Sequence, residues 1–185
     1  MKKLPALLLL AALALVSCEK DDICDGGASS TPRVVIEFFD IADPSESKNV
    51  IDLKVVGTGM ETPLVFNEAA TDDRQYLANT NKIAVPLRTT SGNTEYAFIF
   101  NADATDPTQT FTDTIDFNYT TSEVYVSRAC GFKKEFDFLP GTDPLMPPVM
   151  LNNNPNAGSG SWIQDIRIVQ YHIEDETETH VYIMY

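Results

Sequence analysis

Cys18 has the clearest chemical role in this sequence, because of the residues that precede it. Lys2 and Lys3 are followed by an apolar run, residues 4–16, and then by the small Ser17. Positive charge, apolar run and small residue, in that order, are typical of a secretory signal peptide. The run has 13 residues, whereas a transmembrane helix needs about 20. We therefore expect residues 1–17 to be a leader that is removed.

The thiol at the end of this leader predicts a lipid anchor. Leu15-Val16-Ser17-Cys18 resembles the lipobox of bacterial lipoproteins. The resemblance implies a diacylglycerol thioether on the Cys18 sulfur, cleavage before this residue and acylation of the new amino group. Two or three acyl chains make desorption from a membrane very slow. The alternative is an ordinary signal peptide that happens to be followed by a cysteine.

The residues after Cys18 bear on the destination of the mature protein. Glu19, where some Gram-negative lipoproteins carry an Asp that retains them in the inner membrane, favours the outer membrane. Cys18-Glu19-Lys20-Asp21-Asp22 also resembles the surface-export signal of Bacteroidota lipoproteins, a lysine followed by two acidic residues. The alternative is a solvated acidic tail. The predicted location is the outer membrane, with the protein lipid-anchored and exposed at the cell surface.

Two further cysteines, Cys24 and Cys130, follow the leader. An exported chain folds where thiols are not kept reduced, so one disulfide between them is the simplest expectation. It would close a loop of about 107 residues, for which the chain-entropy model predicts at most about 4.7 kcal/mol. Free thiols or an intermolecular bond are the alternatives, since spacing alone does not bring two sulfurs together. Six chain steps from Cys18 to Cys24 span at most about 20 Å, so this disulfide would hold the domain close to the membrane.

Charge and length limit the classes of partner and the number of domains. The chain has 27 acidic and 13 basic residues, and Lys2 and Lys3 leave with the leader, so the mature formal charge is −16. Such a chain repels polyphosphate and anionic lipid headgroups, which argues against nucleic acid as a partner. We expect residues 18–31 to form a tether and residues 32–185 to form one domain, an ordinary length for a single core.

Apolar residues recur at every second position in short runs separated by Gly, Pro, Asn, Asp and Ser. This alternation is typical of half-buried antiparallel strands. About nine strands are expected, carrying Val34, Ile36 and Phe38; Ile51, Leu53 and Val55; Ile83, Val85 and Leu87; Tyr96, Phe98 and Phe100; Ile115, Phe117 and Tyr119; Val124 and Val126; Phe132, Phe136 and Phe138; Ile166 to Ile173; and Val181, Ile183 and Tyr185. We interpret these side chains as core. The pattern predicts an all-β fold, an antiparallel two-layer immunoglobulin-like sandwich, with a closed β-barrel as the alternative.

Finer features of the pattern predict local structure. Pro86 has no N–H to donate, which favours an edge strand or a bulge. The alternating runs on either side of residues 91–93 predict a hairpin. The apolar phase shifts between residues 162 and 173, which a β-bulge would explain. One helical turn is expected over residues 71–77, with Thr71 as its cap.

Few residues suggest catalysis or metal binding. His172 and His180 are the only histidines, and the spacings G-x-S-x-G, H-E-x-x-H and C-x-x-C do not occur. We therefore expect no enzyme activity and no catalytic residue, although a glycosidase could use a pair of carboxylates alone. Oxygen-bearing side chains gather in residues 101–106 but lack the glycine and the final glutamate of an EF-hand. We interpret that segment as a solvated turn, and expect neither a metal nor a cofactor.

One short motif predicts a covalent modification. Asp113-Thr114-Ile115 resembles the O-glycosylation motif of Bacteroidota, with Thr114 as the acceptor. Attachment of a glycan requires the hydroxyl to be exposed. The motif lies within a predicted strand, so an unmodified strand residue is the alternative.

Residues 140–161 form a long connection with an unusual composition. Most connections in compact domains have about 4–6 residues, and those above about 12–15 are usually functional or disordered. Pro147 and Pro148 stiffen the segment, which lowers the entropy lost on docking. We predict that it binds a partner through its apolar side chains, which are Leu145, Met146, Val149, Met150 and Leu151. The alternative is that these side chains cap an open end of the sandwich.

The whole pattern is similar to a family of uncharacterised Bacteroidota lipoproteins. The similarity lies in Cys18-Glu19-Lys20-Asp21-Asp22-Ile23-Cys24, Thr31-Pro32-Arg33 and Ala129-Cys130-Gly131-Phe132. It would cover nearly all of the mature chain. The resemblance implies an envelope location and paired cysteines, and it brings no assigned activity and no functional residues.

Two classes of function fit these observations. The first is a non-enzymatic lipoprotein that acts as an accessory subunit for an outer-membrane protein partner, which the short tether favours. The second is a glycan-binding lipoprotein of a nutrient-uptake system, which would need exposed Trp or Tyr rings to stack on sugars. Trp162 is the only tryptophan, so the sequence supports the second class less well.

Overall fold

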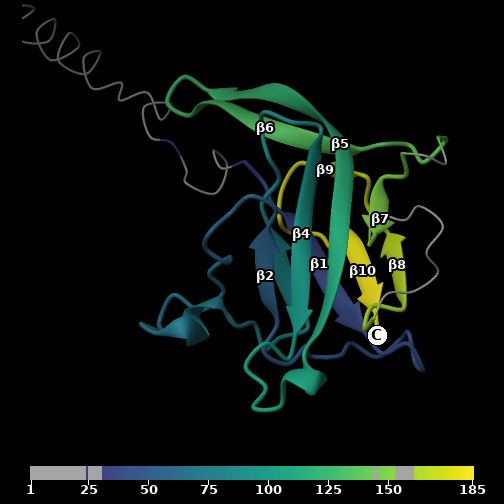
Figure 1. Cartoon of the computed structure of the whole chain (residues 1–185). Helices are drawn as coiled ribbons and strands as arrows, with labels where there is room; N and C mark the ends of the chain where they lie inside the picture. Colours follow the sequence, from purple (N-terminus) through teal and green to yellow (C-terminus); the bar gives the residue numbers. More distant parts are fainter. Residues whose placement is uncertain (1–23, 25–30, 144–145, 153–160) are drawn as a thin grey trace, which may run out of the picture. The chain divides into compact units, whose positions relative to one another are not determined.

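The computed structural model describes Cys24 and residues 31–143, 146–152 and 161–185 (Figure 1). The leader, Cys18, the charged residues after it and Leu145 lie outside this part of the chain. The chain divides into two compact units. Residues 1–30 and 124–133 form the smaller unit, and residues 31–123 and 134–185 form the larger one. No helix within the described residues is long and apolar enough to cross a membrane.

Alternating apolar residues form ten strands in the described residues, joined by turns and two short 3₁₀ helices. The strands are β1 (Val34–Phe39), β2 (Lys54–Gly57), β3 (Lys82–Val85), β4 (Asn93–Phe100), β5 (Phe111–Ser127), β6 (Gly131–Phe138), β7 (Val149–Leu151), β8 (Asp165–Ile168), β9 (His172–Ile173) and β10 (Val181–Met184). The 3₁₀ helices are η2 (Asp73–Tyr76) and η3 (Pro107–Gln109). Strands β5 and β6 begin or end in the smaller unit, and the other strands belong to the larger one.

The strands form two sheets that pack as a β-sandwich, which confirms the predicted fold class and not the alternative closed barrel. One sheet has the order β3-β1-β10-β8, and the other has the order β2-β4-β5-β6-β9, with β7 paired to β5. One pair departs from the predicted antiparallel arrangement, because β1 and β10 are parallel, with Ile36 opposite Val181. Parallel neighbours need a long connection. Here the whole of the remaining fold lies between the first and the last strand.

The core lies between the two sheets of the larger unit. In β1, Val34, Ile36 and Phe38 are fully buried, and in β4 Tyr96 and Phe98 are buried from the opposite sheet. Period-two alternation gives each strand one face toward the core. Burial of each such side chain contributes about 1.5–3 kcal/mol to folding. The sequence pattern therefore identified most of the core correctly.

Two predicted connections are wrong. Residues 83–87 and 96–100 do not form a hairpin, because β3 pairs with β1 in one sheet while β4 pairs with β2 and β5 in the other. The predicted bulge between residues 162 and 173 is instead a change of sheet, since β8 pairs with β10 and β9 pairs with β6. Alternation within a strand shows which face is buried, but it does not show which strand lies alongside.

Two predicted local features also differ. Ile51 is 54% exposed and precedes β2, because Asp52 adopts a positive φ of 42° that interrupts the extended backbone. The helical turn forms as the 3₁₀ helix η2, and its cap is Asp72 rather than Thr71. The Asp72 carboxylate accepts a hydrogen bond from the Arg74 N–H at 3.2 Å. The Asp72 carboxylate, one residue after the predicted cap, thus satisfies a backbone N–H of the first turn that has no partner within the helix.

Phe132 is a further departure, since it was predicted to lie in the core beside Phe136 and Phe138. Phe136 and Phe138 are buried, whereas the Phe132 side chain is 65% exposed. Phe132 and Phe136 also fall in different compact units. The alternation therefore continues into residues 131–133 of the smaller unit, where it does not mark a buried face.

Candidate functional site

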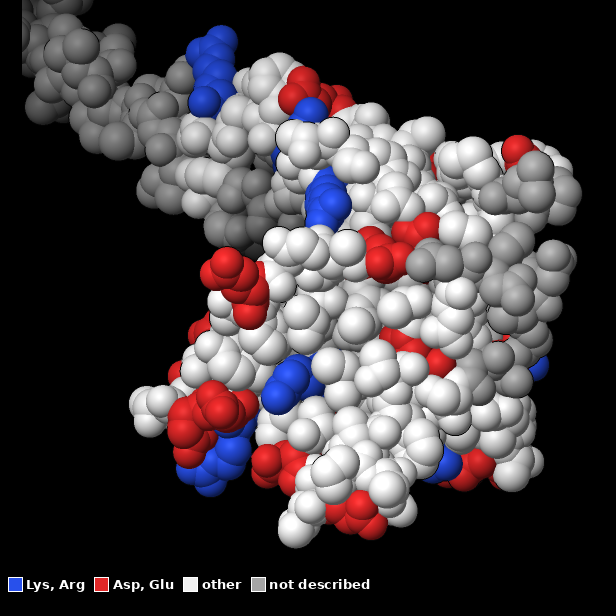
Figure 2. Space-filling view, viewed as in Figure 1, with Lys and Arg blue, Asp and Glu red and all other residues white. Residues whose placement is uncertain are grey.

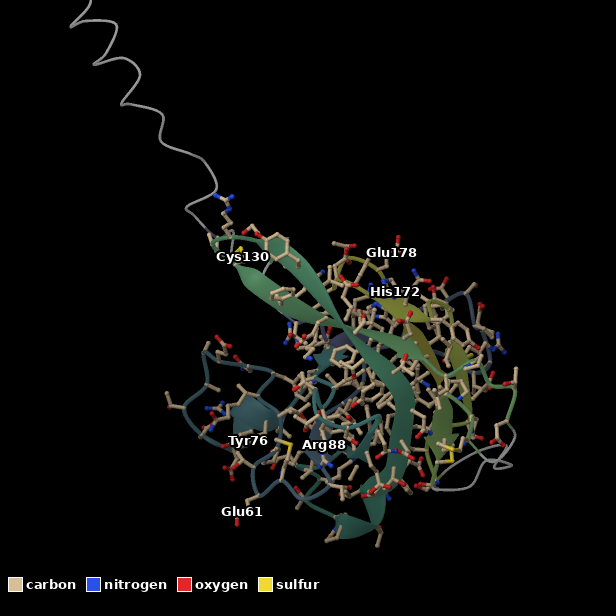
Figure 3. All side chains as sticks on the ribbon, turned by 90° about the horizontal axis from the view of Figure 1, so that it is seen from above. Glu61, Tyr76, Arg88, Cys130, His172 and Glu178 are labelled. Carbon is tan, nitrogen blue, oxygen red and sulfur yellow. A yellow bond between two sulfur atoms is a disulfide. The ribbon has the colours of Figure 1, made fainter. Side chains whose placement is uncertain are left out.

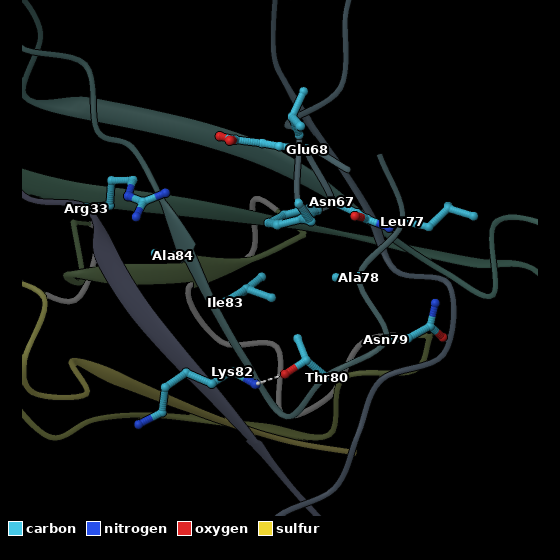
Figure 4. A pocket seen from close by; sticks show the side chains of 12 residues that line it. Arg33, Asn67, Glu68, Leu77, Ala78, Asn79, Thr80, Lys82, Ile83 and Ala84 are labelled. Carbon is cyan, nitrogen blue, oxygen red and sulfur yellow. Dashed lines mark hydrogen bonds between the residues drawn. The ribbon is translucent and has the colours of Figure 1, made fainter. Parts of the chain in front are cut away.

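The larger unit contains a cavity of about 550 Å³ beside strand β3, which we call the β3 slot (Figure 4). Its lining comes from the start of β1, from two connecting segments and from β3. The lining residues are Arg33, Val65, Phe66, Asn67, Glu68, Leu77, Ala78, Asn79, Thr80, Lys82, Ile83 and Ala84. Ile83 and Ala78 are 5% and 3% exposed, so they form an apolar floor, while Val65, Asn67 and Glu68 are exposed.

Among the strands that the structure describes, β3 is the first of its sheet, so its edge on the side of this slot is unpaired. The Phe38 N–H donates to the Asn81 carbonyl at 2.8 Å, so the backbone of Asn81 points toward β1. Successive residues of a strand direct their N–H and C=O groups to opposite sides. Ile83 therefore faces β1, which its register opposite Ile36 supports. The N–H and C=O of Ala84 face away from β1, on the side of the slot.

Lys82 is the second residue of β3 whose backbone faces away from β1, and its N–H has a weak partner within the protein. The Lys82 N–H points toward the Thr80 hydroxyl, with the nitrogen and oxygen 3.4 Å apart (Figure 4). That is a long hydrogen bond, and it leaves Ala84 as the residue of β3 whose backbone faces the slot most openly. The strand ends at Val85, immediately before Pro86. The prediction that Pro86 marks an edge strand is therefore confirmed.

Charged side chains lie at the margins of the slot, and most of their charge is balanced locally. Arg33 Nη2 lies 2.6 Å from Glu176 Oε2, and Arg33 Nε donates to Glu176 Oε1 at 2.8 Å. This hydrogen bonding, together with the nearby charges of Glu176 and Glu68, raises the pKa of Arg33, and the same bond lowers the pKa of Glu176. Lys82 Nζ lies 3.3 Å from Glu37 Oε2. The slot thus offers an apolar floor and polar margins without a large net charge.

This arrangement is suited to binding an extended chain. A free sheet edge supplies backbone donors and acceptors, and an added strand places alternate side chains over the floor. The twelve lining residues include neither a histidine nor a cysteine. The chemistry that the slot offers is therefore hydrogen bonding and apolar contact.

The predicted partner-binding segment is not one continuous loop. Val149, Met150 and Leu151 form β7, which pairs with β5. Leu151 is 7% exposed and belongs to the core, and Val149 packs against it. Met150, opposite Asp116, is partly exposed, and Met146 is 52% exposed. The structure therefore places these predicted site residues in two different environments, core and surface.

Asp113 of the predicted glycosylation motif is buried and heavily used. Its carboxylate accepts hydrogen bonds from the backbone N–H groups of Ser161, Trp162 and Ile163 at 2.7, 2.9 and 2.9 Å. It also accepts from the side chains of Ser161 and Asn152. Burial alone would raise the pKa of Asp113, but these hydrogen bonds outweigh it and lower the pKa. The Asp113 carboxylate therefore links Asn152 and residues 161–163 to β5 through hydrogen bonds.

Thr114 lies on the other face of β5 from Asp113 and is half-buried. Its backbone N–H donates to Asn152 Oδ1 at 2.9 Å, and its carbonyl accepts from the Asn152 N–H at 2.8 Å. The hydroxyl position is thus partly accessible on a well-held backbone. Glycosylation of Thr114 stays a prediction.

The two histidines occupy different surroundings. His180 is 2% exposed, and its Nδ1 accepts a hydrogen bond from the Val35 N–H at 2.9 Å. Burial lowers the pKa of His180. His172 Nδ1 lies 2.7 Å from Asp137 Oδ1 in a more exposed position. Within the described residues, no three His, Cys, Asp or Glu side chains are placed to hold a metal ion.

The structure joins Cys24 and Cys130 in a disulfide, with their Cα atoms 5.0 Å apart, as the sequence predicts. Both residues belong to the smaller unit. The β3 slot was not predicted, although Pro86 after an edge strand was a signal for it. The exposure of Phe132 was not predicted either, although the nearby Arg128 and Lys133 were a signal.

These features define a β-sandwich protein with a disulfide-linked N-terminal segment and a free sheet edge beside a slot. Residues 52–185 match the family described as "Family of unknown function (DUF6452)". The match covers more than half of the chain, so the protein belongs to this family. No curated protein and no solved structure matches the chain.

Proposed function

We propose that this protein is an exported lipoprotein of the Bacteroidota outer membrane, anchored through Cys18, that binds an envelope protein without catalysing a reaction. The leader and the lipobox-like junction at Cys18 support the anchor. The disulfide of Cys24 is consistent with an oxidising compartment. The observation that carries the binding function is the β3 slot beside a free sheet edge.

The partner would contribute an extended segment that adds to β3. An added strand would pair with the outward N–H and C=O of Ala84 and lay an apolar side chain over Ile83 and Ala78. Specific recognition by strand addition combines such backbone pairing with pockets for alternate side chains. Figure 2 shows carboxylate groups in several separate patches over the visible face rather than as one continuous field.

Glycan binding is the alternative function, and Trp162 gives it no support. The Trp162 side chain is 7% exposed, and its indole N–H donates to the Phe98 carbonyl at 3.1 Å. Its ring also stacks on Phe100 with centroids 5.1 Å apart. A sugar stacked on Trp162 would need the ring face that this packing covers, so the exposed rings of Tyr125 and Tyr171 are the ones that this alternative would have to use.

Site-specific cross-linking in intact cells tests the proposed binding function. A photoreactive phenylalanine at Asn67, which lines the slot, should cross-link one envelope protein that mass spectrometry identifies. The control places the same photoreactive phenylalanine at Thr105, which is exposed and does not line the slot. Equal cross-linking of the same proteins from both positions would contradict the proposal.

A pair of variants at Ala84 then tests the binding mode. Ala84→Pro removes the outward N–H without removing a bond to β1, whereas Ala84→Val keeps the N–H and changes only the side chain. We expect Ala84→Pro to lower cross-linking from position 67 by about tenfold, the effect of losing about 1.4 kcal/mol of backbone pairing. Ala84→Val should retain most of it, and thermal denaturation should show both variants folded. Unchanged cross-linking in folded Ala84→Pro would rule out strand addition at this edge.

A further inference from the structure

The smaller unit contains a hairpin tip, residues 124–133, whose surface differs from the rest of the chain. Phe132 and Tyr125 are 65% and 56% exposed, the highest values for large hydrophobic side chains in the described residues. Their rings form an edge-to-face pair with centroids 5.4 Å apart. The two rings therefore make a preassembled apolar surface open to solvent.

The turn that presents these rings is well formed. The Cys130 N–H donates to the Ser127 hydroxyl at 3.0 Å. Gly131 has a φ of 72°, a conformation that glycine adopts without steric cost. Strands β5 and β6 therefore lead into and out of a tight connection that fixes Tyr125 on one strand and Phe132 on the other.

The charge of this hairpin tip is opposite to that of the protein as a whole. Residues 124–133 contain Arg128 and Lys133 and no acidic residue, in a chain with 27 acidic and 13 basic residues. Arg128 is exposed. Cations beside aromatic rings suit the interface of an anionic bilayer, where rings settle at headgroup level and cations meet phosphate groups.

The disulfide connects this same hairpin tip to the N-terminal segment. Cys130 lies at the end of the hairpin, where Figure 3 labels it, and it is bonded to Cys24. Cys24 follows Cys18 by six residues. Six residues reach at most about 20 Å, so a lipid on Cys18 would keep the hairpin tip within that distance of the membrane.

We propose that the hairpin tip docks on the lipid bilayer, with Tyr125 and Phe132 in the interface and Arg128 against anionic headgroups. The inference rests on the proposed lipid anchor at Cys18. Docking adds a second contact to the lipid anchor, because the anchor supplies a high effective concentration for a small surface. The membrane would thereby restrict the orientation of the smaller unit.

Quenching by brominated lipids tests this proposal on the full-length lipoprotein. Phe132→Trp places a reporter in the hairpin tip, and Phe111→Trp places one at a 39% exposed position in the larger unit. Each protein is purified from membranes and returned to vesicles of phosphatidylcholine and phosphatidylglycerol that carry bromine at defined depths. The wild-type protein, with buried Trp162 alone, gives the background.

We expect Phe132→Trp emission to shift to shorter wavelength and to lose at least about half its intensity to shallow bromines, as for an interfacial ring. Phe111→Trp and the wild-type protein should change little. Adding Arg128→Glu to Phe132→Trp should weaken the quenching in anionic vesicles and leave it unchanged in vesicles of phosphatidylcholine alone. Thermal denaturation before reconstitution verifies that each variant is folded.

The outcomes separate this proposal from the lipid anchor itself. Mass spectrometry of the same samples determines whether Cys18 carries lipid. If lipid is present and Phe132→Trp is quenched no more than Phe111→Trp, docking is wrong and the anchor stands. If Cys18 carries no lipid, both proposals fall. Efficient photo-cross-linking from position 125 to a protein, without quenching in vesicles, would assign the hairpin tip to a protein partner and overturn bilayer docking.

Discussion

Two places in the larger unit differ in whether their backbone N–H and C=O groups find partners inside the protein. Around Asp113, one carboxylate accepts three consecutive backbone N–H groups and two side-chain donors, so every one of these donors is satisfied inside the protein. Along β3, the N–H and C=O of Ala84 face a slot. The first arrangement builds structure, and the second leaves hydrogen-bonding capacity for another molecule.

The comparison shows why burial and polarity alone do not locate a binding site. Asp113 is a buried carboxylate with a shifted pKa, and such features are often associated with function. Its hydrogen bonds, however, are all made to neighbouring chain segments, and its lowered pKa follows from them. At the β3 slot, the pKa of Arg33 is raised by its hydrogen bond to Glu176, which is likewise a contact within the protein, and the slot has the shape and the unpaired edge that binding requires.

The largest expected effect comes from removing the structural carboxylate. Asp113→Ala would leave three backbone donors near the core without an acceptor, which should lower the free energy of unfolding by about 3–5 kcal/mol. Asp116→Asn is the matched control, because Asp116 is a buried carboxylate on the same strand. Burial raises the pKa of Asp116, so replacing its charge should cost less than about 1 kcal/mol. Urea denaturation of both variants measures the contrast, and equal losses would mean that Asp113 has no special structural role.

The next effect distinguishes the two environments of the predicted partner-binding segment. Leu151→Ala should lower the free energy of unfolding by about 2–4 kcal/mol, since it opens a cavity beside Ile115. Met146→Ser should change the melting temperature little, because this side chain is 52% exposed. Calorimetry of the two variants tests this. A large loss in Met146→Ser would show that the segment caps the core along its whole length. Cross-linking from position 146 would show whether it contacts a partner.

A smaller effect concerns pH and His180. The pKa of His180 is lowered in the folded state, chiefly by burial, while the charges of Asp175 and Glu176 act in the other direction. Below about pH 6.5 the unfolded chain therefore binds more protons than the folded one, so stability decreases as the pH falls through this range. Protonation would also remove the acceptor for the Val35 N–H, a bond worth about 0.5–1.5 kcal/mol.

His180→Asn should reduce this pH dependence, because an amide oxygen accepts a hydrogen bond without titrating. His172→Gln is the control and should retain most of the dependence, since burial, the main cause of the lowered pKa of His180, is unchanged, although the charge of His172 also lowers that pKa. Urea midpoints between pH 7 and pH 5 provide the measurement. The same slope in the wild-type protein and in His180→Asn would assign the pH dependence to other groups.

Local alternation predicted which residues of most strands are buried, because a strand directs successive side chains to opposite faces whatever its neighbours are. Val34, Ile36 and Phe38 illustrate this. The predicted hairpin over residues 83–100 failed because strand pairing depends on contacts between segments that the chain brings together only when it folds. For the same reason, the parallel pairing of β1 with β10 could not be read from either strand.

The sequence by itself determined the all-β class and most of the core, because each depends on residue type and period. The even count of cysteines after Cys18 made a bond between Cys24 and Cys130 the simplest expectation, which the structure confirms. Only the tertiary structure decided which face of β3 borders a slot, that Asp113 gathers donors from residues 161–163, and that Phe132 remains exposed. The same pattern of apolar side chains can be covered or left open. Which of these side chains are covered is set by contacts between residues that lie far apart in the sequence.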